Sequence, residues 1–470
     1  MKKIKLYNTL TKQVEEIKPI NRDTFRIYSC GPTVYNNAHI GNLATQIRED
    51  LLRRVLKSAG YKVKHAMNIT DVEDKIIRDS KKPEFFVEDD DMQSLLNLTK
   101  KYYQVFRDDF VKIGNDVESV QFIKATETIP EMVDLINKLF ENGIAYKAED
   151  GIYFSIEKYL GSGYEYGLLQ NIDLSLSRER IKNDEYEKDS AADFALWKAE
   201  SEGEPAWDAE FIDETGLKFG MPGRPGWHIE CSAMSQKLLG VPFDIHTGGI
   251  DLKFPHHENE IAQSCGALKL NAFVRIFVHM NHVMVDGRKM SKSLGNFYTL
   301  RDIEERGFPP QAFRLLVMSG HYQNETNFSW EILEAAQNRL NNWLDAAELI
   351  HQGEDGEPSL EFEDNLLSAL TNNLDTPAAL SLVDAFIDQM NSNPLTAKLK
   401  ARQLVESLNK LLGINLKVDD ISLQQKELIA KRAEARANKD WAESDRIRDL
   451  LLKQGIKLKD TDSGQAWSRA

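Results

Sequence analysis

Residues 27–42 read Ile-Tyr-Ser-Cys-Gly-Pro-Thr-Val-Tyr-Asn-Asn-Ala-His-Ile-Gly-Asn, and this stretch decides the fold. It predicts a short apolar strand over residues 26–30, a Gly-Pro turn, and a helix over residues 42–59 that follows His39. Unpaired N–H groups and the positive end of the helix dipole favour a phosphate at such a junction. Gly41 would let the backbone approach a flat base closely, because it has no Cβ. By itself, a His-x-Gly pattern is weak evidence for a nucleotide site.

The flanking sequence extends this stretch into a β-α-β unit. Apolar residues recur along the helix at the spacing of one face: Ile47, Leu51, Leu52, Val55 and Leu56. The helix should end at Gly60, and residues 61–67 then predict the next strand. Such a crossover builds a parallel sheet, whose carboxyl edge binds ligands. Residues 68–71 fall at that edge, although a simple helix cap explains them equally well.

Composition limits the class of protein. The 470 residues suggest about three domains, and 41% hydrophobic with 28% charged residues is ordinary for a globular protein. The sequence has no apolar run long enough for a membrane helix and no signal peptide, so we expect a cytoplasmic protein. Three cysteines are too few for a disulfide framework.

The charge distribution leaves room for a nucleic-acid partner. The net charge of −15 argues mildly against one. Residues 425–470, however, contain eleven Lys/Arg and eight Asp/Glu, a net of +3. This asymmetry permits an RNA-facing C-terminal segment without proving one.

The remaining sequence divides into further segments. Helices are expected over residues 92–113 and 129–142, and a hairpin around residues 149–151. Residues 121–220 interrupt the α/β rhythm with strands, glycine-rich turns and charged runs such as 183–189, which predicts an insertion. Residues 1–120 and 221–285 would form the nucleotide-binding domain, and residues 286–330 a connection. Residues 331–414 predict an all-α bundle, and residues 415–470 a small C-terminal domain with two helices around residues 438–440.

A second pattern suggests a metal site. Pro255 is a natural helix start, so residues 256–268 should be helical. His256 and Glu260 would then share a helix face, with His257 and Glu260 as the alternative pair. Together with Cys30 and Cys231 they offer the ligand types of tetrahedral zinc. Each residue also has an ordinary structural explanation, since a lone cysteine is usually a small buried hydrophobe.

Residues 289–293, Lys-Met-Ser-Lys-Ser, carry two lysines that suit a polyphosphate. With residues 39–42 upstream, they resemble the HIGH and KMSKS signatures of class I aminoacyl-tRNA synthetases. The whole chain is similar to the cysteinyl-tRNA synthetase family. The matching stretches are YSCGPTVYNNAHIGN, NITDVEDKII, GRPGWHIECSAM, DLKFPHHENEIAQS, VDGRKMSKSLGN and RAEARANKDWAESDRIRDLLLKQGIKLKDT.

The resemblance implies a fold and an activity. The fold would be a Rossmann-like α/β catalytic domain with an inserted α+β segment, followed by an all-α bundle and a small anticodon-binding domain. The activity would be ATP-dependent activation of L-cysteine to cysteinyl-adenylate and its transfer to the 3′ end of tRNA(Cys). One zinc ion per subunit would select the cysteine thiol, Mg²⁺ would accompany ATP, and a monomer is expected.

The resemblance also implies roles for individual residues. The zinc ligands fall on Cys30, Cys231, His256 and Glu260. The catalytic positions are His39, Asn42, Lys289 and Lys292. The ATP-binding positions are His39, Gly41, Gly248, Asp251 and Lys292. The positions that bind the amino acid are Gly31, Thr70, Trp227 and His246. Trp467 would stack on an unpaired tRNA base.

The sequence departs from the family motifs at two places, and two alternative functions are possible. Asn42 replaces the last histidine of the HIGH motif, and residues 279–282 differ from the usual His-x-Gly. One alternative is a related cysteine ligase that passes cysteine to an amino sugar, which would lack the basic helical tail. The other is a non-enzymatic nucleotide- or RNA-binding module whose fold is ordered by zinc, which a pyrophosphate-exchange assay would separate from an enzyme.

Overall fold

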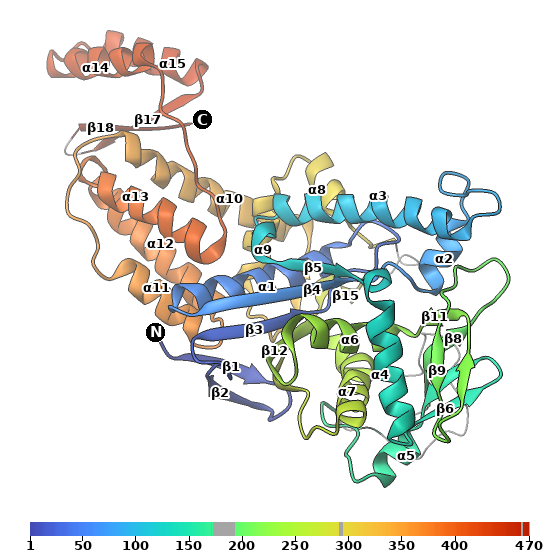
Figure 1. Ribbon diagram of the computed structural model, residues 1–470. Helices are drawn as coiled ribbons and strands as arrows, with labels where there is room; N and C mark the ends of the chain where they lie inside the picture. Colours follow the sequence, from blue (N-terminus) through green and yellow to red (C-terminus); the bar gives the residue numbers. More distant parts are fainter. Residues whose placement is uncertain (171, 173–192, 291–294, 462–463, 470) are drawn as a thin grey trace.

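The computed structural model describes residues 1–170, 172, 193–290, 295–461 and 464–469. A parallel sheet with the strand order β13-β12-β3-β4-β5 lies at the centre (Figure 1). Its strands are β3 (Thr24–Ser29), β4 (Lys62–Ile69), β5 (Gln121–Lys124), β12 (Phe243–Gly249) and β13 (Val274–Met280). The sheet grows from β3 first toward β5 and later toward β13, which creates a topological switch point between β3 and β12. The predicted Rossmann-like α/β fold is confirmed.

Helices cover both faces of this sheet and divide the core in two. Helix α1 (Ile40–Ser58) packs on one face, where Ile27 of β3 joins its core. Tyr28, the next residue, points to the opposite face. That face is covered by α4 (Ile129–Glu141), α6 (Trp227–Leu239) and α7 (Glu258–Leu268). The predicted β-α-β unit is therefore present as β3-α1-β4, and strand alternation assigns its side chains to the two cores.

The inserted segment forms an antiparallel sheet in the order β11-β8-β7-β6. Its elements are β6 (Ala145–Ala148), β7 (Gly151–Phe154), α5 (Ile156–Gly161), β8 (Phe194–Ala199) and β11 (Gly223–Pro225), and beside it lies the hairpin of β9 (Glu210–Ile212) and β10 (Lys218–Gly220). The expected boundaries at residues 121 and 221 both fall inside sheets. Strand β5 pairs with β4 in the parallel sheet, and β11 pairs with β8 in the insertion. The charged run at 183–189 lies outside the described residues.

Helices α2 (Asp74–Ser80) and α3 (Asp91–Lys112) connect β4 to β5, and an N-terminal hairpin is formed by β1 (Ile4–Asn8) and β2 (Gln13–Ile17). After β13, strands β14 (Val283–Val285), β15 (Arg288–Lys289) and β16 (Thr326–Phe328) form a small sheet, accompanied by α8 (Leu300–Glu305) and α9 (Pro310–Ser319). Short 3₁₀ and π turns lie at Val117–Ser119, Ala125–Thr128, Ile250–Leu252, Lys253–His257, Glu348–His351, Pro394–Thr396 and Leu408–Leu412.

The predicted bundle follows as α10 (Trp330–Ala347), α11 (Phe362–Thr371), α12 (Thr376–Ser392) and α13 (Lys398–Ser407). Its apolar side chains belong to the same continuous core as α1, so the bundle and the sheet are packed against each other. Within the described residues, no helix combines the length and the low polarity that crossing a membrane requires.

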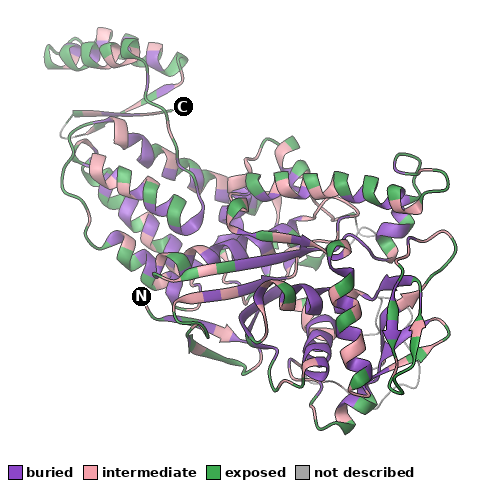
Figure 2. Cartoon of the chain, viewed as in Figure 1, coloured by how far each residue is buried: buried purple, intermediate pink, exposed green. Residues whose placement is uncertain are grey.

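The C-terminal module contains α14 (Leu423–Ala437), α15 (Trp441–Lys453), β17 (Ile456–Thr461) and β18 (Gly464–Arg469). It lies at the end of the molecule opposite the insertion, and its helices are largely exposed (Figures 1 and 2). The side chain of Gln352 bonds both main-chain groups of Trp467, at 2.7 and 2.8 Å. Arg469 pairs with Glu348 at 2.6 Å. Strand β18 thus anchors the module to the bundle.

Candidate active site

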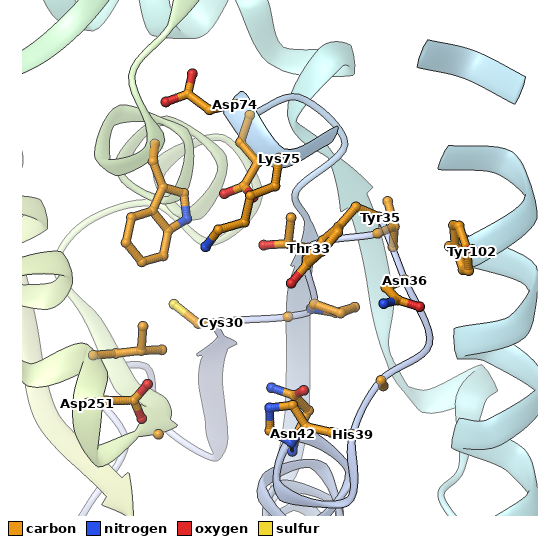
Figure 3. A pocket seen from close by; sticks show the side chains of 18 of the residues that line it. Cys30, Thr33, Tyr35, Asn36, His39, Asn42, Asp74, Lys75, Tyr102 and Asp251 are labelled. Carbon is orange, nitrogen blue, oxygen red and sulfur yellow. Dashed lines mark hydrogen bonds between the residues drawn. The ribbon is translucent and has the colours of Figure 1, made fainter. Parts of the chain in front are cut away.

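A cavity of about 1130 Å³ opens at the carboxyl edge of the parallel sheet, at its switch point. Figure 3 looks into it: Cys30 at the end of β3 points toward the cavity, His39 and Asn42 lie at the N-terminus of α1, and Asp251 lies on the β12 side. This is where open α/β sheets bind ligands. Lys289 also lines the cavity.

The N-terminus of α1 is capped by His39. Its Nδ1 accepts hydrogen bonds from the backbone N–H groups of Gly41 and Asn42, at 3.0 and 3.2 Å. A Cβ on Gly41 would lie 2.7 Å from Met290 Cε and 2.8 Å from His39 Cε1. A side chain at this position would therefore displace the end of Met290 and the capping imidazole. His39 both fixes the start of the helix and lines the cavity.

The residues expected to bind ATP lie only partly on the cavity wall. Asp251 lines the cavity with a side chain that is 60% exposed, and it lies 4.0 Å from His282 Nδ1. Gly249 lines the cavity next to it, whereas Gly248 packs against the His257 ring, where a Cβ would lie 3.0 Å from Cε1. Lys292 lies outside the described residues.

The four predicted metal ligands come together. Their donor atoms all lie within 4.8 Å of one another. The Sγ atoms of Cys30 and Cys231 are 3.9 Å apart, His256 Nε2 is 3.1 Å from Glu260 Oε1, and Cys30 Sγ is 3.9 Å from the same oxygen. Tetrahedral zinc bonds of about 2.3 Å to sulfur and about 2.0–2.1 Å to nitrogen or oxygen require separations of roughly 3.3–3.8 Å. The donor set therefore fits zinc without large movement.

The local helix differs from the prediction. A π turn over Lys253–His257 precedes α7, which begins at Glu258 rather than at residue 256. The turn still brings His256 onto the same side as Glu260. It also brings His257 Nε2 to 3.3 Å from Cys30 Sγ, so a second set of His246, His257, Cys30 and Glu260 meets the same distance limit. The set with two thiols is the better match to zinc, which prefers thiolate ligands.

Burial sets the protonation of these donors. It raises the pKa of the Cys30 thiol well above its ordinary value, and the neighbouring Cys231 adds to the shift. Burial raises the pKa of Cys231 as well. It lowers the pKa of His256 to about 3, which keeps the imidazole neutral and its lone pair available. A bound cation reverses the effect on the thiols, because it stabilises the thiolates directly.

The four expected cysteine-binding residues are split between the cavity wall and the layer behind it. Gly31 and Trp227 line the cavity, and the Trp227 ring stacks on His256 at 4.2 Å between centroids. Thr70 is buried and donates to Glu230 at 3.2 Å. His246 is buried and bonds Glu260 at 2.9 Å. In this structure the last two residues orient carboxylates rather than face the cavity.

Two family models and several curated proteins match this chain. Residues 16–338 match the model of the class I (C) tRNA synthetase catalytic domain, and residues 418–467 match the cysteinyl-tRNA ligase anticodon-binding domain. The cysteine–tRNA ligase of Leptospira interrogans serovar Lai is 41% identical, and the alignment covers 100% of both chains. The chain belongs to the cysteine–tRNA ligase family. The enzyme of Brachyspira hyodysenteriae is 40% identical, also over 100% of both chains.

Among solved structures, the ligase resembles Mycobacterium tuberculosis methionyl-tRNA synthetase in complex with methionyl-adenylate. The TM-score is 0.59 at 12% identity, and the match covers 83% of this chain and 92% of the other. A likeness at this identity supports the class I synthetase fold. The match over 418–467 also disfavours an amino-sugar ligase, which would lack this C-terminal domain.

The two tryptophans of the C-terminal domain differ in exposure. Trp467, the residue expected to stack on a tRNA base, is 6% exposed and packs in the small core with Ile447 and Leu451. Trp441, at the start of α15, is 56% exposed, and the Arg436 guanidinium lies 5.7 Å from its ring centroid. Both tryptophans stand in the matched sequence, but only a structure distinguishes the buried ring from the open one.

Sequence reasoning also missed Lys75 and Tyr28. Lys75 lies at the start of α2, is exposed and lines the cavity (Figure 3). It stands in the quoted stretch NITDVEDKII, but nothing in its spacing marked it. Tyr28 lies two residues before Cys30, so alternation along β3 was a signal that both side chains share one face.

Proposed function

We propose that the chain activates L-cysteine with ATP and transfers the cysteinyl group to the 3′ end of tRNA(Cys). The observation that carries this proposal is the cluster of Cys30, Cys231, His256 and Glu260, whose donors meet beside a nucleotide-sized cavity. Cys30 belongs to both, since it lines the cavity. The family supports the same activity, because its relatives are cysteine–tRNA ligases over their full length.

The reaction would proceed in two displacements. The cysteine carboxylate attacks the α-phosphorus of ATP, and pyrophosphate leaves. A terminal hydroxyl of the tRNA then attacks the carbonyl carbon of the adenylate, and AMP leaves. Positioning and charge stabilisation can carry both steps without a covalent enzyme intermediate. His39 with the N-terminus of α1 would meet the phosphates, and Lys289 with Lys292 would stabilise the departing pyrophosphate.

The metal cluster would provide the choice of amino acid. Cysteine and serine differ by one atom, and a pocket that reads shape and apolar contact separates such pairs by only about 1–3 kcal/mol. Zinc bound at these donors would supply a borderline-soft acid that holds a thiolate far better than a hydroxyl. Trp227, which stacks on His256, would wall the amino-acid pocket. Mg²⁺ would accompany ATP, and the chain would act as a monomer.

The C-terminal domain would bind the tRNA through an exposed surface. Trp441 offers an open ring face, and Arg436 lies beside it. Aromatic rings and guanidinium groups stack on the unpaired bases of RNA loops. The residues that contact the anticodon would therefore lie around the start of α15 rather than at Trp467.

The experiment is cysteine-dependent exchange of pyrophosphate into ATP, with serine in parallel, on the full-length chain. We expect exchange with cysteine and none with serine. Cys231→Ser should reduce exchange by on the order of a hundredfold and release the zinc, as the loss of metal-site residues generally does. Cys265→Ser is the matched control, because Cys265 is also buried but lies outside the cluster.

A zinc-loaded, folded sample without exchange would overturn the proposal. It would favour a binding module whose fold is ordered by zinc. If exchange occurs but charging of tRNA(Cys) does not, the activation step stands and the assignment of the tRNA fails.

A further inference from the structure

Tyr28 lies next to the metal cluster for reasons of strand geometry. It precedes Cys30 by two residues, and Cys30 continues the pairing of β3 one residue beyond its end by donating its N–H to the Thr247 carbonyl at 3.1 Å, so the two side chains point to the same face. Its register partner on the neighbouring strand is His246, whose Nε2 bonds Glu260 at 2.9 Å. The rings of Tyr28 and His246 meet edge to face with their centroids 5.3 Å apart. Helix α6, which carries Cys231, packs on β3 from the same side.

The hydroxyl of Tyr28 is buried without a hydrogen bond of normal geometry to any residue that the structure describes. The side chain is 0% exposed, and its oxygen has no hydrogen-bond partner of normal geometry among the described residues. A buried hydroxyl without a partner destabilises the folded chain. Cys231, Cys30 and Glu260 are the ligand residues close to this hydroxyl, and of these Cys231 is the one within reach of a side-chain hydrogen bond.

A thiol and a thiolate differ greatly as partners for this hydroxyl. A neutral thiol is a weak acceptor, which agrees with the absence of a normal hydrogen bond among the described residues. A thiolate is a charged acceptor, and hydrogen bonds to charged groups are roughly twice as strong as neutral ones. The metal-bound form of the cluster would therefore provide the partner that Tyr28 lacks.

We propose that Tyr28 is a positioning residue for the zinc centre, and that its O–H donates a hydrogen bond to the Cys231 thiolate. The inference rests on the proposed function, because it assigns a residue that adjusts the site for the substrate thiol. The hydrogen bond holds the Cys231 ligand in place. It also draws electron density from that sulfur, which leaves the metal a stronger acceptor for a further thiolate.

The test uses Tyr28→Phe in the full-length chain, measured without ATP or tRNA. Tyr28→Phe removes one oxygen and keeps the ring that packs on His246. We expect zinc affinity, measured by competition with a chromogenic chelator, to fall about tenfold, as for other residues that support metal ligands. In the Co²⁺-substituted protein, the thiolate-to-cobalt absorption band should move to longer wavelength, because the sulfur loses a stabilising hydrogen bond.

Tyr322→Phe is the matched control. Tyr322 is also buried, and its hydroxyl donates to Asn373 at 2.7 Å, away from the cluster. It should leave affinity and spectrum unchanged. If Tyr28→Phe does not fold, 3,5-difluorotyrosine at position 28 provides a stronger donor of similar shape and should shift the band to shorter wavelength.

The outcomes separate the two proposals. If wild-type protein binds zinc and exchanges pyrophosphate with cysteine, but Tyr28→Phe matches wild type in both affinity and spectrum, the proposed function stands and the role of Tyr28 is refuted. If wild-type protein takes up neither zinc nor Co²⁺, the zinc-dependent function and the role of Tyr28 fail together.

Discussion

The two faces of the parallel sheet each carry a buried cluster of polar side chains, and the two clusters satisfy their charges differently. On the α1 face, the carboxylate of Asp50 accepts hydrogen bonds from Arg54 Nε and Arg314 Nη2, both at 2.6 Å, and also pairs with Arg53. Arg314 goes on to donate to the carbonyl oxygen of Leu412, at the end of the bundle, at 2.6 Å. Every charge in this Asp50 cluster meets a partner from the chain.

On the opposite face, the metal cluster is made of thiols, a histidine and a carboxylate. Within the described residues, the ion-pair partners of Glu260 are histidines. Of these, His256 is kept neutral by burial, which lowers its pKa to about 3. A cluster whose charged groups all meet partners from the chain stabilises the folded chain, whereas one that gathers acidic and soft donors is suited to a cation from outside. This difference predicts a structural role for the Asp50 cluster and a metal-binding role for the cluster around Glu260.

The largest expected effect is on the structural side. Asp50→Asn leaves Arg314 buried without its counter-charge, and breaking a buried pair costs about 3–5 kcal/mol. We expect the free energy of unfolding in urea to fall by that amount, while pyrophosphate exchange per folded molecule stays close to wild type. A loss of activity without a loss of stability would show that the Asp50 cluster also serves the site.

Removal of metal should reduce activity and leave the fold intact, which is the reverse of the result expected for Asp50→Asn. A chelator is expected to reduce cysteine-dependent exchange by on the order of a hundredfold, since in the proposed function a metal at the cluster binds the substrate thiol. The far-UV circular dichroism should be retained, because the surrounding core is large and apolar. Re-addition of zinc should restore exchange. Unfolding on chelation would instead place the metal among the elements that hold the fold together.

The Asp50 cluster should also give a pH signature. Burial raises the pKa of the Asp50 carboxyl, but Arg314, Arg53 and Arg54 outweigh it and lower the pKa from 3.8 to about 2. A depressed pKa adds stability above pH 4 that is lost as the pH falls toward 2. This lowering of the pKa corresponds to about 2 kcal/mol of stability. The difference in unfolding free energy between wild type and Asp50→Asn should therefore narrow by most of that amount from pH 5 to pH 2, where half of the folded Asp50 is protonated.

Parallel measurements at both pH values check this expectation. Effects of the other carboxyl groups cancel in the difference between the two proteins. A gap that stays constant with pH would mean that Asp50 titrates normally, and that the three arginines do not stabilise its charge.

The two C-terminal tryptophans show a similar contrast, because Trp467 is buried and Trp441 is exposed. Trp441→Ala removes an exposed ring, and stacking of one base is worth about 1–3 kcal/mol. We expect the KM for tRNA to rise roughly tenfold while pyrophosphate exchange is unchanged. Trp467→Ala should instead lower the stability of the C-terminal domain, because its ring is buried. A larger effect on tRNA binding from Trp467 in a folded protein would reverse this assignment.

The sequence predicted the features that follow from long periodic patterns. The helix after His39 was expected from its apolar stripe, and the pairing of His256 with Glu260 from helical spacing, which survived the unexpected π turn. Strands β5 and β11 pair across the expected boundaries of the insertion, and segments of 4 and 3 residues show no clear alternation from which such pairing could be predicted.

Side-chain direction and long-range contacts were beyond the sequence. Whether His246 faces the cavity or supports Glu260 depends on the register of β12 against β3. The burial of Trp467 depends on Gln352, 115 residues away in the chain. Likewise, no spacing reveals that the Tyr28 hydroxyl lacks a partner among the described residues. These features arise when distant segments pack together, so local patterns do not carry them.

The smallest effect is expected at Asn42, which differs from both clusters because it is exposed on the cavity wall. Asn42→His would add an imidazole of ordinary pKa, about 6.5, at the first turn of α1. Its charged form would attract the ATP phosphates but oppose the helix dipole, and a charge at a helix end is worth about 0.3–1 kcal/mol. We therefore expect kcat/KM for ATP in the exchange reaction to rise no more than about fivefold at pH 6, and the gain to disappear above pH 7.5, where the imidazole is neutral. The ratio of variant to wild type across this range measures the effect without interference from other titrating groups. A change that persists at pH 8 would show that Asn42 acts through its amide geometry, and an exposed residue would then contribute as specifically as the buried ones.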